Sequence, residues 1–159
     1  MSTADRLLLI LHIGFAIFAL GPLTAVLHST PRYIREGNAT VLRFLSRTTQ
    51  IYAGASLGVL LFGLFLASGK FDQVWLSASM TLYIVSLVLL VIVERDQRKC
   101  LSAIEASTAE VPAAPATETK DKTAPAAAPD MTAHLARISS LSGIITLLWI
   151  IILILMVWH

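Results

Sequence analysis

Long uncharged stretches dominate the pattern of hydrophobic and polar positions along the chain. Four runs contain no Lys, Arg, Asp or Glu, and they cover residues 7–27, 48–68, 74–93 and 141–158. A transmembrane helix needs about 20 apolar residues, because each residue adds about 1.5 Å and the hydrocarbon core is about 30 Å thick. Each run has about this length, so the sequence predicts an all-α fold: a four-helix transmembrane bundle in one integral membrane domain, residues 1–159.

Other fold classes fit these runs poorly. Helices of a soluble bundle carry a polar stripe at the 3.6-residue period, and the run 141–158 offers only Ser142, Gly143 and Thr146 outside its apolar residues. Barrel strands alternate in polarity, which the runs do not. A signal peptide has an apolar stretch of about 7–15 residues and a small-x-small cleavage site. The first run is longer and lacks that site, so we expect a retained span.

Charge is scarce but placed with a strong bias. Charged residues make up 14% of the chain, against about 25% in soluble domains. Ten of the twelve basic residues lie between spans one and two or between spans three and four, and only Arg6 and Lys70 lie on the other side. Basic residues stay on the cytoplasmic side of membrane proteins. The bias predicts two cytoplasmic connections and extracytoplasmic termini.

Turn and cap signals subdivide the first long connection. Ser29 or Thr30 before Pro31 predicts the start of a short helix, because proline is tolerated at the first helical position. Gly37 is expected to end that helix, and Asn38 to cap the next one. The next helix is predicted to continue unbroken into the second span.

The connection between spans three and four changes character midway. Residues 94–110 are predicted to extend span three as a charged helix. Residues 111–130 hold four of the six prolines and are rich in Ala and Thr. That composition buries too little apolar surface to fold alone, so we expect a low-complexity linker there.

Four arginines in the first connection are candidate interaction residues. They are Arg32, Arg35, Arg43 and Arg47. One interpretation is that they anchor the helices at the inner headgroups, as interfacial arginines commonly do. The other is that they form a docking face for acidic residues of a partner.

Gly54 and Gly58 form a small-xxx-small motif in the second span. Such motifs let helix backbones approach closely in membranes. Two contacts fit the motif, one with another helix of the same bundle and one with another protein.

His12 is the one exception to the absence of carboxylates and basic residues from the predicted spans, and it lies about a turn and a half from the outer end of its span. Ionisable groups inside the membrane are the usual pointers to function. A haem held by two histidines needs a facing ligand, and His159 is the only other candidate on the outer side. His28 lies at the opposite end of the span, and His134 falls in the linker. We therefore expect a hydrogen-bonded packing histidine and no cofactor or metal.

Hydroxyl groups give the third span a polar face. Ser79, Tyr83 and Ser86 fall near one side at helical spacing, where Ser56 of the second span can meet them. Hydroxyls of this kind usually form hydrogen bonds between helices.

Other reactive chemistry is sparse. Cys100 is the only cysteine, so the chain cannot form an internal disulfide or a cysteine metal cluster. There is no phosphate-binding glycine loop and no nucleophile elbow. The basic residues lie at membrane flanks, which gives nucleic-acid binding no support. We expect a protein that is not an enzyme.

Three motifs of the first half resemble a known family. They are the run Leu11-His-Ile-Gly-Phe-Ala-Ile-Phe-Ala-Leu-Gly-Pro-Leu23, the segment Gln50-Ile-Tyr-Ala-Gly54 and the pair Phe62-Gly63. The chain resembles, over about residues 5–95, small four-span membrane proteins common in actinobacteria, whose members mostly lack an assigned function. Small proteins of this kind occur as accessory subunits of the actinobacterial respiratory supercomplex, which joins cytochrome bcc to cytochrome c oxidase. The resemblance implies a multi-pass protein of the bacterial inner membrane with these respiratory-chain subunits as partners.

The sequence therefore leads to one expected function and two alternatives. The expected function is a non-catalytic accessory subunit of a larger inner-membrane complex involved in electron transport. One alternative is a standalone membrane protein that binds lipid, haem or metal within the bundle. The other is a transient assembly factor.

Overall fold

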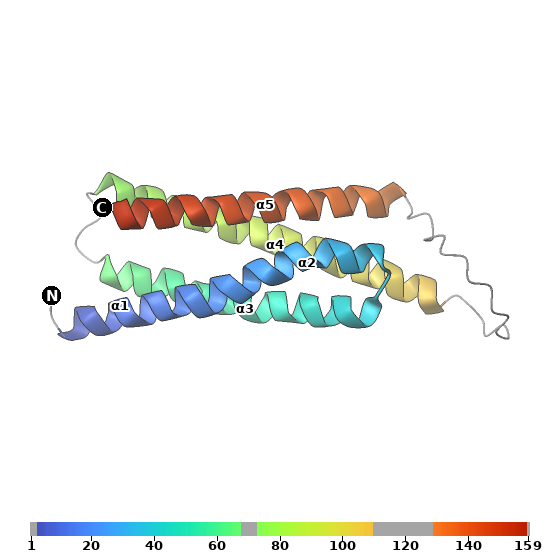
Figure 1. Ribbon diagram of the computed structural model, residues 1–159, viewed down its shortest axis with the longest axis horizontal. Coiled ribbons are helices and arrows are strands. Elements are labelled where there is room, and N and C mark those ends of the chain that lie inside the picture. The colour runs from blue at the N-terminus through green and yellow to red at the C-terminus, as the bar shows by residue number, and fades with distance from the viewer. Residues whose placement is uncertain (1–2, 68–72, 110–128, 159) are drawn as a thin grey trace.

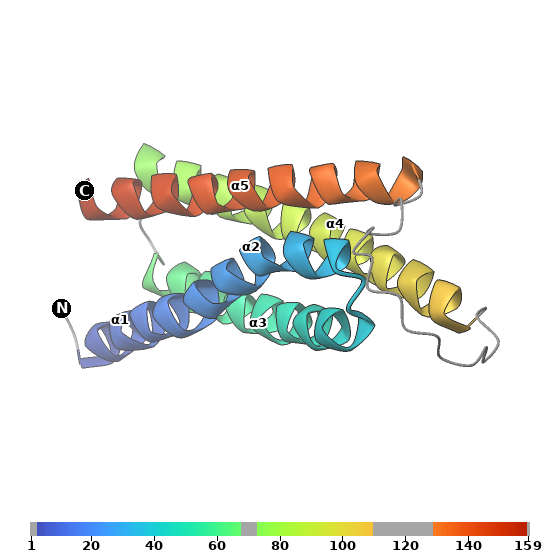
Figure 2. The ribbon, with the colours of Figure 1, turned by 45° about the vertical axis from the view of Figure 1, so that its right-hand side comes forward.

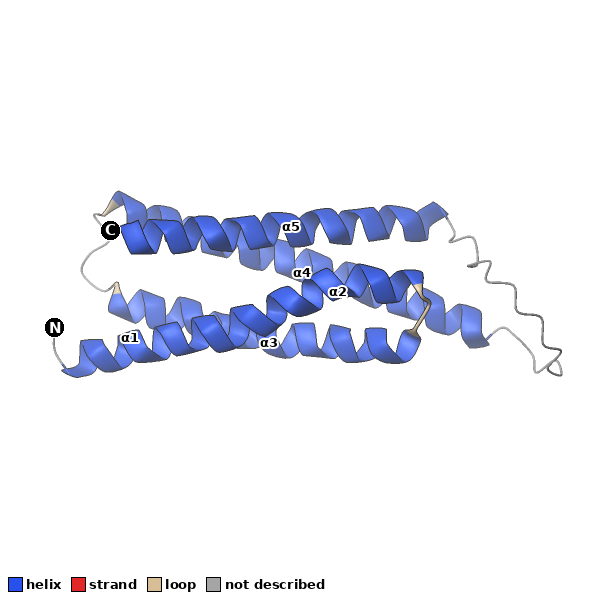
Figure 3. Cartoon of the chain, viewed as in Figure 1, coloured by secondary structure: helices blue, strands red, loops and turns tan. Residues whose placement is uncertain are grey.

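The computed structural model describes residues 3–67, 73–109 and 129–158, and all regular structure in these ranges is helical (Figure 3). Five α-helices and one π-helical segment follow one another along the chain. They are α1 (Thr3–Phe15), η1 (Ala16–Leu20), α2 (Gly21–Arg35), α3 (Ala39–Leu66), α4 (Val74–Ala109) and α5 (Pro129–Trp158).

These elements form four long rods that lie side by side (Figures 1 and 2). Helix α1, segment η1 and α2 join into one continuous rod, Thr3–Arg35, and α3, α4 and α5 are the other three. In the part of the chain that the structure describes, four helices are long and apolar enough to cross a membrane. The predicted all-α, four-span architecture is confirmed. The start of α1 and the end of α5 lie at the same end of the bundle.

The rods differ in how they pack. Helix α5 runs along α4, and α3 packs against α1, α2 and α4. Helix α2 approaches α5 and α4, whereas α1 approaches neither of them closely. The first rod therefore lies against α5 near the end with α2 and moves away from it toward the end with α1 (Figure 1).

The bundle continues well beyond the uncharged runs at the α2 end. Helix α4 has 36 residues, which corresponds to roughly 54 Å at 1.5 Å per residue, against about 30 Å for its uncharged run. We call the helical part formed by residues 29–35, 39–47, 94–109 and 129–140 the head. The predicted helical extension of span three is confirmed as far as Ala109.

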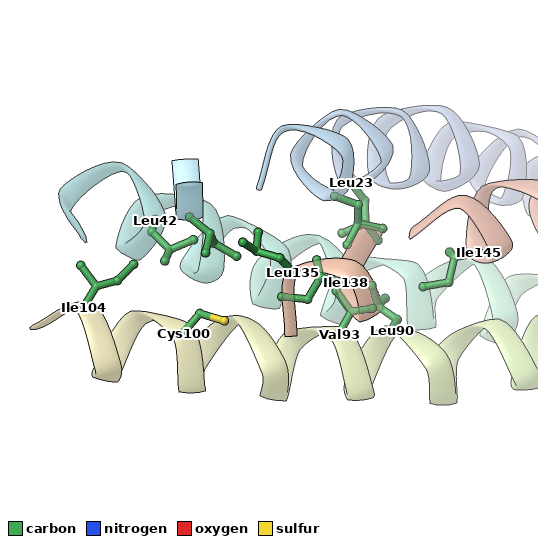
Figure 4. Close-up of a cluster of buried hydrophobic side chains, with 11 residues drawn as sticks. Leu23, Leu42, Leu90, Val93, Cys100, Ile104, Leu135, Ile138 and Ile145 are labelled. Atoms are coloured by element: carbon green, nitrogen blue, oxygen red, sulfur yellow. The ribbon is translucent and has the colours of Figure 1, made fainter. Parts of the chain in front are cut away.

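The head has a packed core of its own. Its buried side chains come from all four rods and join the cluster that includes Leu23, Leu90 and Ile138 (Figure 4). The hydrophobic ones of this cluster that belong to the head are Ile34, Leu42, Cys100, Ile104, Leu135 and Ile138. The Cys100 side chain is only 1% exposed. The sequence predicted helices over most of this region but did not predict that they pack into a common core.

Two boundaries between elements differ from prediction. No new helix begins at Ser29 or Thr30, because α2 passes through Pro31. Proline lacks the N–H that would bond to the carbonyl four residues earlier, which is that of Leu27. The Ser142 hydroxyl of the neighbouring rod α5 lies 3.5 Å from this Leu27 oxygen, but it donates to the Ile138 carbonyl at 2.7 Å. The linker prediction lies outside the described residues over 111–128, and Pro129 already belongs to α5.

The turn between α2 and α3 follows the prediction. Gly37 has φ +64° and ends α2, because glycine adopts this left-handed conformation without a steric penalty. The Asn38 side chain accepts a hydrogen bond from the Val41 N–H at 3.1 Å, which caps α3.

The π-helical segment lies directly before Gly21 and Pro22. Pro22 cannot donate to the Phe18 carbonyl, and its ring crowds that oxygen. Local widening into a π-helical turn is one of the known responses of a helix to such a disturbance. The irregular turn therefore has an identifiable cause in the sequence.

Candidate ligand-binding cavity

A cavity of about 120 Å³ lies between the rods in the half of the bundle that holds α1 and the end of α5. It is open on part of its boundary, and its walls are mainly apolar. Residues of η1, α3, α4 and α5 supply these walls, among them Ala16, Leu20, Leu60, Met80 and Ile152. The cavity follows from the course of the first rod, which moves away from α5 in this half.

His12 is the polar residue that α1 contributes to this cavity. Its side chain is 9% exposed, and Nδ1 lies 2.9 Å from the Val59 carbonyl oxygen of α3. A carbonyl only accepts hydrogen bonds, so Nδ1 carries the proton and donates. In the neutral ring the lone pair then lies on Nε2. The prediction of a hydrogen-bonded packing histidine is confirmed.

Two glycines of α3 allow α1 to approach this closely. A Cβ added at Gly63 would lie 3.0 Å from His12 Cε1 and 3.3 Å from Nδ1. A Cβ at Gly58 would lie 2.6 Å from the Phe15 ring, which itself packs against Phe62 at 5.2 Å between ring centroids. A side chain at Gly58 would therefore force the Phe15 ring to move, and one at Gly63 would make a tight contact with His12.

The structure separates the two glycines of the predicted small-xxx-small motif. Gly58 faces Phe15 inside the bundle, whereas a Cβ at Gly54 would meet nothing within 4 Å. Sequence reasoning named Gly63 only within the Phe62-Gly63 motif of the resemblance and did not place it opposite His12.

The hydroxyl face of span three contributes the next set of polar groups. The Tyr83 hydroxyl donates to the Ser56 carbonyl at 2.8 Å, so the expected meeting of these two residues is confirmed. The Ser79 hydroxyl donates to the Trp75 carbonyl at 2.8 Å. On α5, the Trp149 indole N–H donates to the Ser86 hydroxyl oxygen at 3.2 Å. Tyr83, Ser79 and Trp149 all line the cavity.

A second buried polar group lies in the head. The Asp96 side chain of α4 is 4% exposed and pairs with two residues of α5, Arg137 at 3.3 Å and His134 at 3.7 Å. The Asp96 Oδ2 atom makes no hydrogen bond with good geometry, so the contact with Arg137 is an ion pair only. His134 lies in α5, which corrects its predicted place in the linker.

Gln97 follows Asp96 and points to another neighbour. Its Nε2 donates to the Thr30 hydroxyl oxygen of α2 at 3.0 Å, and its side chain is fully buried. Sequence reasoning missed Asp96 and Gln97, because both stand in a charged stretch that resembles a solvated helix face.

The four predicted interaction arginines lie in or beside the head, at the end away from the cavity. Arg32 pairs with Glu36 on the same rod at 2.9 Å, and Arg43 pairs with Glu105 of α4. Arg35 and Arg47 are exposed and form no ion pair within the described ranges. The structure therefore does not gather the four arginines into one site.

Metal and haem ligands are not assembled around His12 by the residues described. No group of three or more His, Cys, Asp or Glu residues that could hold a metal ion occurs among them. His159, the predicted outer-side candidate for a second haem ligand, lies outside the described residues.

Comparisons with known proteins add nothing to this geometry. Against protein-family models, curated proteins and solved structures, the chain has no match.

Proposed function

We propose that this bundle is a membrane-embedded binding protein that holds an apolar ligand in the cavity beside His12. The observation that carries the proposal is the pairing of an apolar cavity with one fixed imidazole, whose Nδ1–H is held by the Val59 carbonyl. Small-molecule sites are typically apolar concavities with a few well-placed polar groups.

The size of the cavity supports a particular kind of occupant. Its volume of about 120 Å³ is close to that of an apolar protein cavity of about 150 Å³ that binds benzene. A ring or the end of a chain fits this space, and a whole haem does not. The open part of the boundary leaves room for the rest of an elongated ligand outside the rods.

Native mass spectrometry of the protein released from lipid nanodiscs tests the proposal. We expect the native chain to retain a small apolar molecule. Ile152→Trp places a larger side chain in the cavity wall and should lower the retained fraction several-fold. Ile151→Trp is the matched control, because Ile151 is 37% exposed on the same helix. The proposal fails if nothing is retained, or if both variants retain as much as the native chain.

A second function is supported by the head. We propose it as the docking element of a non-catalytic accessory subunit in a larger inner-membrane complex. Contacts between rods, Arg43 with Glu105 and Asp96 with Arg137, hold the head together. It projects beyond the uncharged runs, where a partner can contact it without entering the lipid. The resemblance of the first half suggests the cytochrome bcc and cytochrome c oxidase subunits of the supercomplex as partners.

Affinity purification in mild detergent tests this second function. A permanent subunit co-purifies with haem absorbance and with cytochrome subunits at a fixed ratio. A transient assembly factor gives a variable, substoichiometric ratio. Elution as a colourless protein without partner subunits contradicts both versions and leaves the binding proposal standing.

A further inference from the structure

We infer that the ligand of the cavity carries an O–H hydrogen-bond donor on an apolar body, as a phenol or a long-chain alcohol does. The inference rests on the proposed binding function and narrows it to one chemical class. It follows from an accounting of the hydrogen-bond donors that line the cavity.

Every polar side chain in the cavity wall already donates its hydrogen bond to an acceptor within the protein. The Tyr83 hydroxyl donates to the Ser56 carbonyl and the Ser79 hydroxyl to the Trp75 carbonyl. The Trp149 N–H donates to Ser86. His12 Nδ1–H donates to Val59. The backbone N–H groups of these helices are bonded along the helix. The wall therefore offers a ligand no free side-chain donor from its described polar residues.

The cavity wall still offers a ligand a hydrogen-bond acceptor. The neutral imidazole has its lone pair on Nε2, and no hydrogen-bond partner of this nitrogen occurs in the described structure. The ring is held at Nδ1 by the Val59 carbonyl, and Gly63 lies beside its Nδ1–Cε1 edge. A fixed acceptor loses little entropy when it forms a bond, so it favours a matching donor.

A cavity wall with a free hydrogen-bond acceptor and no free donor distinguishes between ligands of the same shape. A hydroxyl donates to Nε2 and satisfies both groups. A ketone, ether or quinone oxygen finds only acceptors and loses its own hydrogen bonds on entry, which costs about 1–3 kcal/mol for a buried polar group. An ammonium group also donates, but burial of its charge among apolar walls costs more. An O–H group is an uncharged donor that satisfies Nε2 without this cost.

A pair of matched probes tests the inference. The first is para-pentylphenol brominated on the ring, and the second is the equally brominated para-pentyltoluene, in which a methyl group replaces the hydroxyl. The protein carries Trp75→Phe and Trp158→Phe, so that Trp149 in the cavity wall is its only tryptophan, and tryptophan emission is excited at a wavelength that tyrosine does not absorb. Binding is measured in nanodiscs and expressed per mole fraction of probe in the lipid, which corrects for partitioning.

We expect saturable quenching by both probes, with the phenol bound about five- to tenfold more tightly, the range of one net hydrogen bond. His12→Leu should reduce the preference to about one, and Ile13→Leu, on the lipid-facing side of α1, should retain it. The ratio in the native background does not depend on whether the His12 variant folds.

Equal affinity for the two probes, or a preference that survives His12→Leu, overturns the inference and leaves the binding function intact. Absence of saturable quenching by either probe overturns the binding function, and the inference with it.

Discussion

At the scale of single residues, the polar side chains inside the apolar rods have specific partners. Sequence reasoning could place Tyr83 opposite Ser56, because hydroxyls at helical spacing define a face. It could not identify the hydrogen-bond partner of His12. Every residue has a backbone carbonyl, so the sequence does not show that the carbonyl of Val59 is the acceptor. The burial of Asp96 beside the exposed Arg137 was equally hidden, since charge in a sequence indicates exposure more often than burial.

The two glycines of the small-xxx-small motif should respond differently to the same change. Gly58→Ala forces the Phe15 ring to move, because the added Cβ would lie 2.6 Å from it, and we expect a loss of about 1–2 kcal/mol in the free energy of unfolding. Gly54→Ala meets open space and should be neutral or stabilise by up to about 1 kcal/mol through helix propensity. Denaturant titration in mixed micelles, followed by circular dichroism, measures both. Equal effects would mean that α1 does not pack on Gly58.

At the scale of elements, the uncharged runs predicted the number and order of the helices but not their full lengths. The length of an uncharged run indicates only the part of a helix that meets lipid. The helices of the head were therefore predicted from turn, cap and composition signals, and their packing against one another was not predicted. Pro31 misled the boundary prediction for a physical reason. A proline usually ends or begins a helix because it removes a donor, and here Ser142 of α5 approaches the carbonyl left without one. A long-range contact of this kind is not visible in local sequence.

Replacement of Pro31 tests the continuity of α2. Pro31→Ala restores the N–H that can bond to the Leu27 carbonyl, so we expect the free energy of unfolding to stay the same or rise by about 1 kcal/mol. If Pro31 instead began a separate helix, the change would remove a favourable first-position residue and lower stability. Thermal unfolding in detergent distinguishes the two signs.

At the scale of the whole molecule, packing is uneven along the bundle. The head and the neighbouring turns share a large buried cluster, whereas the half with α1 has a smaller one, Val59, Tyr83 and Ile152, beside the cavity. Local composition predicted four spans, because the hydrophobicity of each segment can be read directly from its own residues. It could not predict the cavity, which depends on the angle between the first rod and α5.

The sidedness of the bundle remains a prediction of its charge bias, and cysteine labelling tests it. In a Cys100→Ala background, Gln73→Cys should react with a membrane-impermeant maleimide in intact cells, because it lies at the end with the termini. Arg35→Cys should react only in inside-out vesicles. The reverse labelling pattern would place the termini in the cytoplasm. In the native chain, buried Cys100 should react on either side only after unfolding.

The separation of α1 from α5 also bears on the route by which a ligand would reach the proposed site. A molecule that enters between these two rods arrives sideways from the acyl chains and never crosses open water. Its working concentration is then its mole fraction in the bilayer, so a compound scarce in solution can still saturate the site if it partitions strongly. The fraction of protein with ligand in its cavity would then depend on the chemical composition of the surrounding membrane.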